Sequence, residues 1–191
     1  MKQYKVAVKV GHTSYAKGAY SLTIGESEYD YNLAVAKKLV ELGDCKNIKY
    51  EMFTFDPKVS SYTKRQQLVA KKINEDDFDL VIELHYNSAE SHTARGVLVL
   101  YYYKSSKGRE AAKVIGDSIF NVFQTERDPD VGLSSDKQNG YQAVVTPKPV
   151  AILLEPFFGS NPQESALFKG DEGKTKYALS IHMGVMNYFK I

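Results

Sequence analysis

The stretch Leu80-Val-Ile-Glu-Leu-His85 contains an almost uninterrupted apolar run that ends in a histidine. Such a run is typical of a strand that is buried on both faces of a sheet. Two further runs have the same form, since Val6 to Val10 leads into Gly11-His12 and Val150 to Leu154 leads into Glu155. Three apolar strands that each end in a residue able to bind a metal or move a proton are therefore the main pattern of this sequence.

The segments around these runs predict an α/β domain. The predicted strands are Tyr4 to Val10, Ile48 to Phe55, Leu80 to Leu84, Gly96 to Tyr103 and Val150 to Leu154. The predicted helices are Ser27 to Leu42, Thr63 to Asn74, Arg109 to Phe123, a short helix after Asn161, and Gly173 to Phe189. Because strands alternate with helices, we expect one domain over residues 1–191, with a twisted, mostly parallel sheet flanked by helices on both faces. The polar segment from Asp128 to Gly140 has no periodicity and is expected to be a long surface loop.

The composition excludes several classes of protein. The chain has 25 Lys and Arg against 23 Asp and Glu, a net charge of +2, and lacks the basic stripe that indicates a nucleic-acid partner. No stretch approaches the roughly 18 consecutive apolar residues of a membrane span. Lysines interrupt the apolar residues at the N-terminus, so no secretory signal peptide is predicted. Cys45 is the only cysteine, which excludes an intrachain disulfide and a thiolate zinc cluster.

The ends of the three apolar strands are expected to meet. In open α/β sheets the ligand crevice lies beyond the carboxyl ends of the strands, so His12, His85 and Glu155 should converge on one edge.

A fourth candidate, Glu28, lies at the start of the helix after the first strand. Spacings of four, three, four and three place it on one helical stripe with Asn32, Val35, Leu39 and Leu42. Glu26 lies off this stripe and is the weaker candidate. A carboxylate on a buried face is costly unless it is paired or coordinated, so we expect Glu28 to point inward and to bind a cation.

Two histidines and one glutamate are a common ligand set for a catalytic zinc. Zinc lowers the pKa of a bound water toward about 7 and polarises the carbonyl under attack. We assign His12, Glu28 and His85 to the metal and Glu155 to proton transfer from the water to a leaving amine.

Five motifs of this chain resemble a known family. They are Val6-Ala-Val-Lys-Val-Gly-His12, Gly25-Glu-Ser-Glu28-Tyr-Asp-Tyr-Asn32-Leu-Ala, Leu80-Val-Ile-Glu-Leu-His85-Tyr-Asn87, Ala94-Arg-Gly96-Val and Ile152-Leu-Leu-Glu155-Pro-Phe-Phe-Gly-Ser160-Asn161-Pro162. In order and spacing they resemble the zinc-dependent N-acetylmuramoyl-L-alanine amidases of bacterial cell walls and phage endolysins. The family's zinc ligands fall on His12, Glu28 and His85, and its catalytic glutamate falls on Glu155.

The resemblance implies a phosphorylase/hydrolase-like fold, zinc as the cofactor and peptidoglycan as the substrate. The implied reaction is hydrolysis of the amide bond between the lactyl group of N-acetylmuramic acid and L-Ala. Residues 1–191 would be a catalytic domain without a separate wall-binding domain. It would act at the cell wall after release through a phage holin pore, or as an excised domain of an exported protein.

The chain departs from the family pattern at Glu83, where a small or neutral residue is usual. Period-two alternation places Glu83 on the same strand face as His85. Glu83 could orient His85 or form a salt bridge with a lysine. Pro156 and Phe157 also replace the Leu-Gly that commonly follows the catalytic glutamate.

Two other functions remain open from the residues. The first is a zinc peptidase or deacylase that acts on another amide. The second is a non-catalytic peptidoglycan-binding module, against which stands the presence of all four polar residues of the expected mechanism.

Overall fold

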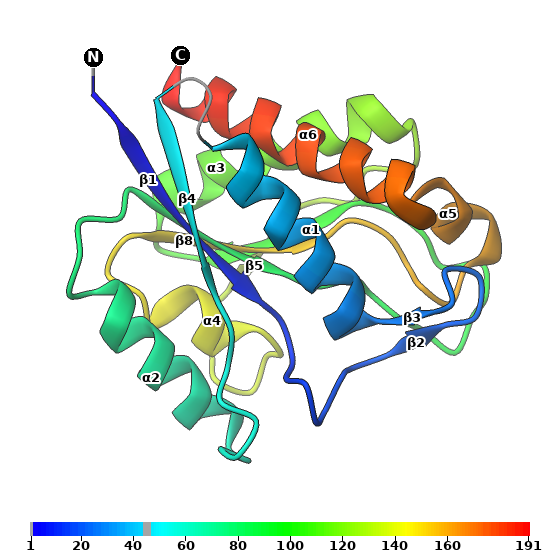
Figure 1. Cartoon of the computed structure of the whole chain (residues 1–191), viewed down its shortest axis with the longest axis horizontal. Helices are drawn as coiled ribbons and strands as arrows, with labels where there is room; N and C mark the ends of the chain where they lie inside the picture. Colours follow the sequence, from blue (N-terminus) through cyan, green and yellow to red (C-terminus); the bar gives the residue numbers. More distant parts are fainter. Residues whose placement is uncertain (1, 44–46) are drawn as a thin grey trace.

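The computed structural model describes residues 2–43 and 47–191, so Cys45 lies outside the described residues. Among the described residues, six strands form one sheet in the order β4-β1-β5-β8-β6-β7. Figure 1 labels four of them, β4, β1, β5 and β8, in the middle of the molecule. Along the sheet the six strands are Ile48–Phe53, Tyr4–Val10, Leu80–Leu84, Val150–Glu155, Leu98–Tyr102 and Val131–Leu133. Two shorter strands, β2 (Tyr20–Ser21) and β3 (Glu26–Ser27), form a separate antiparallel pair.

The sheet is mostly parallel, as predicted. Strands β4, β1, β5 and β8 run parallel to one another, and β7 runs parallel to β6. Within the described part of this sheet, only the β6–β8 pair is antiparallel. The carboxyl ends of β1, β5 and β8 therefore lie side by side at one edge of the sheet.

Helices cover both faces of the sheet (Figure 1). Helices α1, α3 and α6 pack together on one face, and α2 and α4 lie on the other. The helices are α1 (Glu28–Leu42), α2 (Tyr62–Ile73), α3 (Ser106–Phe123), α4 (Tyr141–Val145), α5 (Pro162–Leu167) and α6 (Gly170–Phe189). Within the described residues, no helix combines the length and hydropathy needed to cross a membrane.

Burial on both faces explains why the central strands have apolar runs rather than alternation. In β1, Val6 and Val8 join the large core beneath α1, α3 and α6. Ala7, which points the opposite way, joins the smaller core beneath α2. Because both directions are buried, a polar residue on such a strand needs a buried partner.

The prediction for Asp128 to Gly140 was partly wrong. Residues Val131–Leu133 form β7, which pairs with β6 through Tyr101 and Gly132. A three-residue strand is too short to show periodicity, and only Leu133 is buried. The five-residue helix α4 was not predicted, for the same reason of length.

Element boundaries differ from the predictions by a few residues. Helix α3 begins at Ser106 rather than Arg109, because the side chain of Ser105 accepts a hydrogen bond from the Gly108 amide and caps the helix. Strand β4 ends at Phe53, two residues earlier than predicted.

Candidate metal centre

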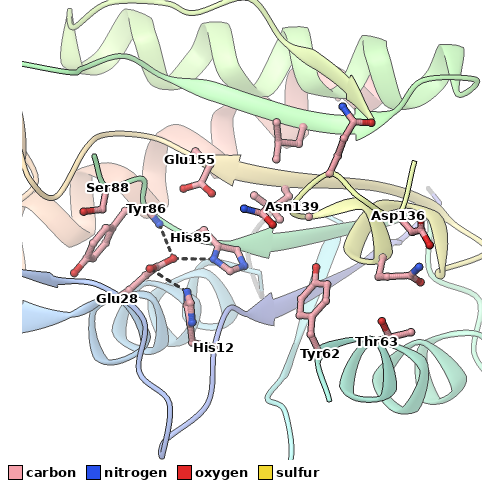
Figure 2. Close-up of a pocket in the computed structure, with 15 residues that line it drawn as sticks. His12, Glu28, Tyr62, Thr63, His85, Tyr86, Ser88, Asp136, Asn139 and Glu155 are labelled. Atoms are coloured by element: carbon pink, nitrogen blue, oxygen red, sulfur yellow. Dashed lines mark hydrogen bonds and ion pairs between the residues drawn. The ribbon is translucent and has the colours of Figure 1, made fainter. Parts of the chain in front are cut away.

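The four predicted site residues meet at the carboxyl edge of the sheet (Figure 2). His12 follows β1, His85 follows β5, and Glu155 is the last residue of β8. Glu28 reaches the same place from the first turn of α1. The convergence predicted from the strand ends is therefore observed.

Helix α1 directs Glu28 inward. The hydroxyl of Ser27 accepts a hydrogen bond from the Asp30 amide and fixes the start of the helix one residue before Glu28. Glu28 is 4% exposed, and the stripe it belongs to is buried at Asn32, Val35 and Leu39 and partly buried at Leu42. The helical periodicity thus gave the correct orientation of this carboxylate.

The Glu28 carboxylate is the centre of the cluster. One oxygen, Oε2, lies 3.0 Å from Nε2 of His12, and the other, Oε1, lies 2.7 Å from Nδ1 of His85. The backbone amides of Tyr86 and Ala19 also donate to these oxygens. Potential ligand atoms of His12, Glu28 and His85 all lie within 4.8 Å of one another.

Glycines allow the side chains of the cluster to approach the backbone. A Cβ on Gly11 would lie 2.5 Å from the imidazole of His85. A Cβ on Gly18 would lie 2.6 Å from Nε2 of His12 and 2.7 Å from Oε2 of Glu28. Gly18 also has a left-handed φ of 76°, which an L side chain rarely adopts. Both glycines are therefore required by the packing of the site.

The donor set fits a divalent cation. Two imidazole nitrogens and one carboxylate are ligands that zinc accepts in catalytic sites. Burial opposes ionisation of Glu28, but hydrogen bonds with His12 and His85 outweigh it and lower the pKa of Glu28 to about 2. The carboxylate is therefore charged at neutral pH, and these three residues could hold a metal ion.

Glu155 is in a different electrostatic environment from Glu28. The residue as a whole is partly exposed, but its Oε2 is buried and has no hydrogen-bond partner among the described residues. Burial raises the pKa of Glu155 to about 8, although the charge of His85 opposes the shift. A carboxyl with this pKa can both hold and release a proton near neutral pH.

Glu83 makes both of the contacts that were expected as alternatives. Its Oε2 lies 2.5 Å from Nζ of Lys9, and its Oε1 lies 3.0 Å from Nε2 of His85. The residue thus pairs with a buried lysine and contacts a candidate metal ligand at once.

The cluster forms one side of a pocket of about 540 Å³. In Figure 2, Tyr62, Thr63 and Asp136 lie across the pocket from Glu28 and the histidines, whereas Asn139 lies nearer to His85 and Glu155. Gln138 and Gln142 also line the pocket. Ser88 lies beside the cluster. No pattern in the sequence indicated that the α2 residues line a pocket, whereas the polar composition of the loop before α4 is consistent with a binding role.

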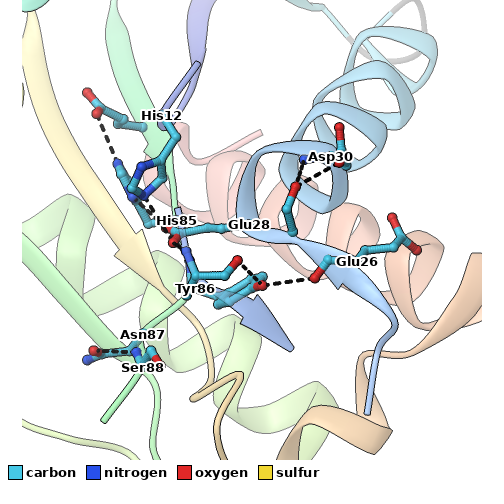
Figure 3. Close-up of polar contacts among 11 residues, drawn as sticks. His12, Glu26, Glu28, Asp30, His85, Tyr86, Asn87 and Ser88 are labelled. Atoms are coloured by element: carbon cyan, nitrogen blue, oxygen red, sulfur yellow. Dashed lines mark hydrogen bonds and ion pairs between the residues drawn. The ribbon is translucent and has the colours of Figure 1, made fainter. Parts of the chain in front are cut away.

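The remaining polar candidates have structural partners. Glu26 forms an ion pair with Lys174 at 2.5 Å, and in Figure 3 it lies on the opposite side of Glu28 from the histidines. His182 is buried, and its Nδ1 lies 3.0 Å from the hydroxyl of Tyr50. His92 is exposed in a loop and contacts the carbonyl of Ser160. None of these three histidine or glutamate side chains lines the pocket.

Comparison with known proteins identifies similar chains. A family model described as N-acetylmuramoyl-L-alanine amidase (Amidase_3) matches residues 6–187. The germination-specific N-acetylmuramoyl-L-alanine amidase of Bacillus subtilis is 29% identical over 120 residues, covering 62% of this chain and 48% of that protein. The probable cell wall amidase LytH of Staphylococcus aureus is 25% identical over 188 residues, covering 96% of this chain and 58% of that protein. The chain thus matches only about half the length of these two curated relatives.

A solved structure shows the same fold. The catalytic domain of the CD27L endolysin targeting Clostridia Difficile has a TM-score of 0.79 and 26% sequence identity to this chain. The similarity covers 97% of this chain and 98% of that one. The fold of this chain therefore also occurs in the catalytic domain of an endolysin.

Proposed function

The chain belongs to the N-acetylmuramoyl-L-alanine amidase family, and from this premise we propose that it is a zinc-dependent hydrolase of peptidoglycan. The bond cleaved is the amide between the lactyl group of N-acetylmuramic acid and L-Ala. The observation that carries the proposal is the cluster of His12, Glu28 and His85 beside Glu155, at the base of a pocket.

The metal ligands are His12, Glu28 and His85. When bound there, zinc supplies positive charge that polarises the scissile carbonyl and lowers the pKa of a water and of neighbouring acids. The three side chains hold their positions through Glu28, whose two oxygens contact one histidine each. Ionised Glu28 also contributes the negative charge that a cation requires.

Glu155 is the proton-transfer residue. In its ionised form it accepts a proton from the water that attacks the amide carbonyl, and it then gives that proton to the nitrogen of L-Ala as the C–N bond breaks. Its partly buried position limits competition from bulk water, and its Oε2 has no competing hydrogen-bond partner among the described residues.

The pocket wall opposite the cluster holds the substrate. Tyr62 and Thr63 at the start of α2 offer hydroxyl groups along this wall, and Asn139 and Gln142 add amide groups to the lining of the pocket. Such groups suit the hydroxyl and amide groups of a muramyl peptide. The volume of about 540 Å³ is sufficient for the reacting part of the glycopeptide and not for a folded partner.

The site of action is the cell wall. Two findings support this: the relative in Staphylococcus aureus is described as a probable cell wall amidase, and the similar solved structure is an endolysin catalytic domain. Peptidoglycan is then the principal partner of the chain.

The test is digestion of purified peptidoglycan, followed by mass spectrometry, with and without a chelator. The expected products carry free lactyl carboxylates and free amino groups on L-Ala, and they form only when zinc is present. Cleavage of another amide instead would indicate a zinc peptidase or deacylase. Binding of peptidoglycan without any cleavage, by a protein without zinc, would indicate a non-catalytic module.

A further inference from the structure

We propose that Glu83 is a positioning residue for His85, held in place by its buried ion pair with Lys9. The inference rests on the proposed function, because it concerns how one ligand of the same metal site is oriented. It assigns a role to two buried charged residues that neither the metal nor the proton-transfer step uses.

The ion pair lies between the sheet and α2. Lys9 and Glu83 are register partners on the neighbouring parallel strands β1 and β5, and both point toward α2. The two side chains are 1% and 0% exposed, and their charged atoms are 2.5 Å apart. The lysine Nζ also donates to Oε1 of Gln66 at 2.7 Å and to the carbonyl of Ala143 at 3.1 Å.

Helix α2 completes the surroundings of Glu83. The amide of Gln66 donates to both carboxylate oxygens of Glu83, each at 2.9 Å. With Lys9 also on Oε2 and His85 also on Oε1, each oxygen of the Glu83 carboxylate has two partners, and the carboxylate cannot rotate without breaking several of these contacts. Its position relative to His85 is therefore fixed by the fold.

Stability alone does not explain this arrangement. Removing two charges from water costs several kcal/mol per ion, and a well-packed apolar pair is often at least as stabilising. The neighbours of Lys9 and Glu83 on the same face, Ala7 and Val81, belong to an apolar core that such a pair would extend. A role in orienting His85 accounts for the charges.

The contacts of His85 show what this role is. Nδ1 of His85 lies 2.7 Å from Oε1 of Glu28, which belongs to the cluster. Nε2 of His85 lies 3.0 Å from Oε1 of Glu83, which lies outside the cluster. A neutral imidazole has one N–H and one lone pair. A hydrogen-bond acceptor such as Oε1 of Glu83 at Nε2 favours the N–H on that nitrogen, which leaves the lone pair of Nδ1 for the cation. Gly11 lies against Cε1 and Nε2 of the same ring, which further limits the movement of the imidazole.

The hydrogen bonds around Lys9 and Glu83 also lead to helices that line the pocket. Gln66 lies on α2 one turn after Tyr62 and Thr63, which form the wall opposite the cluster. The carbonyl of Ala143 belongs to α4, next to Gln142, which also lines the pocket. The buried pair thus connects a metal ligand with two helices that contribute residues to the pocket.

The experiment compares zinc affinity in two double variants by competition with a chromophoric chelator. Lys9→Met/Glu83→Leu removes both charges and the acceptor for His85, whereas Lys9→Met/Glu83→Gln removes both charges and retains an acceptor. We expect zinc to bind about 10–100-fold more weakly to the Leu variant and within about threefold of wild type to the Gln variant. Asp130→Asn, which breaks the Arg127–Asp130 ion pair away from the pocket, is the control and should leave zinc affinity unchanged.

If Glu83 and Lys9 only stabilise the fold, the zinc affinities of the variants should not differ. Equal zinc affinity in the Leu variant, the Gln variant and wild type would overturn the inference, whatever their melting temperatures. If the Leu variant does not fold, Glu83→Asp provides the same comparison, since it keeps a charge for Lys9 but withdraws the carboxylate from His85. Unchanged affinity of Glu83→Asp would overturn the inference as well. A wild-type protein that binds no zinc would instead refute the proposed function, and so the two failures are distinguishable.

Discussion

Oε1 of Glu28 lies 2.7 Å from Nδ1 of His85, although 57 residues separate the two in the sequence. The contact joins the first turn of α1 to the end of β5, and the second oxygen of the same carboxylate reaches His12. Because Glu28 is the member that contacts both histidines, its loss should affect the cluster more than the loss of any other nearby carboxylate.

The first prediction concerns metal binding by Glu28. Glu28→Gln removes the ligand charge while keeping the shape, so zinc affinity should fall by at least about 100-fold. His12→Ala and His85→Ala should have effects of similar size. Zinc content and affinity, measured by elemental analysis and chelator competition, provide the check. Glu26→Gln is the matched control, because Glu26 lies two residues away but pairs with Lys174, and it should retain full zinc content.

The second prediction separates proton transfer from metal binding. Glu155→Gln should lower kcat by about 10²–10⁴-fold because the proton can no longer pass from the water to the amine. Its zinc content should remain that of wild type, since Glu155 is not assigned as a ligand. Muramyl-peptide release and zinc content should be measured on the same preparation. A variant with full activity would contradict the mechanism, and a variant without zinc would make Glu155 a ligand instead.

The third prediction follows from the raised pKa of Glu155. The pKa of Glu155 is about 8 in the folded, chelator-treated protein, against an ordinary 4.5. The stability that the protonated Glu155 contributes is therefore fully present below about pH 4.5 and is lost as the pH rises through 8. Glu155→Gln should therefore stabilise the metal-free protein at pH 8 to 9, by at most about 5 kcal/mol, and have little effect at pH 5.

Thermal denaturation of the metal-free wild type and variant across this pH range measures the effect. The difference in melting temperature should grow with pH by several degrees. A difference that is constant with pH, or that shrinks as the pH rises, would show that Glu155 is ionised in the folded protein without the metal.

Much of the site could be predicted from the sequence because its members occupy regular positions. His12, His85 and Glu155 end apolar strands, and parallel strands end at one edge. Glu28 could be oriented because its helix shows a 3.6-residue period over several turns. These are properties of long elements, where local pattern and tertiary burial agree.

The opposite wall of the pocket could not be predicted in this way. Tyr62 and Thr63 lie on α2 and Asp136 lies in the loop before α4, and their meeting depends on how these segments pack rather than on any local period. For Glu83, alternation predicted the strand face but not the partner. Its contact with Lys9 depends on the register of β1 against β5, which the sequence does not show.

The last prediction compares two glycines that share a backbone conformation. Gly18 and Gly25 have φ values of 76° and 81°, so alanine at either position should cost about 1–2 kcal/mol and lower the melting temperature by about 2–8 °C. The two sites differ in what a Cβ would meet. At Gly25 no atom lies within 4 Å, whereas at Gly18 the Cβ would lie 2.6 Å from His12 and 2.7 Å from Glu28.

The ends of those two side chains can move more easily than the backbone, so Gly18→Ala should displace the ligands without a larger loss of stability. We expect zinc affinity to fall by at least about tenfold in Gly18→Ala and to remain unchanged in Gly25→Ala, because only displaced ligands alter the metal site. Chelator competition and thermal denaturation on both variants distinguish the effects. Equal zinc affinity in the two would mean that His12 and Glu28 bind the cation from positions other than those in the structure, and their assignment as ligands in this geometry would then be wrong.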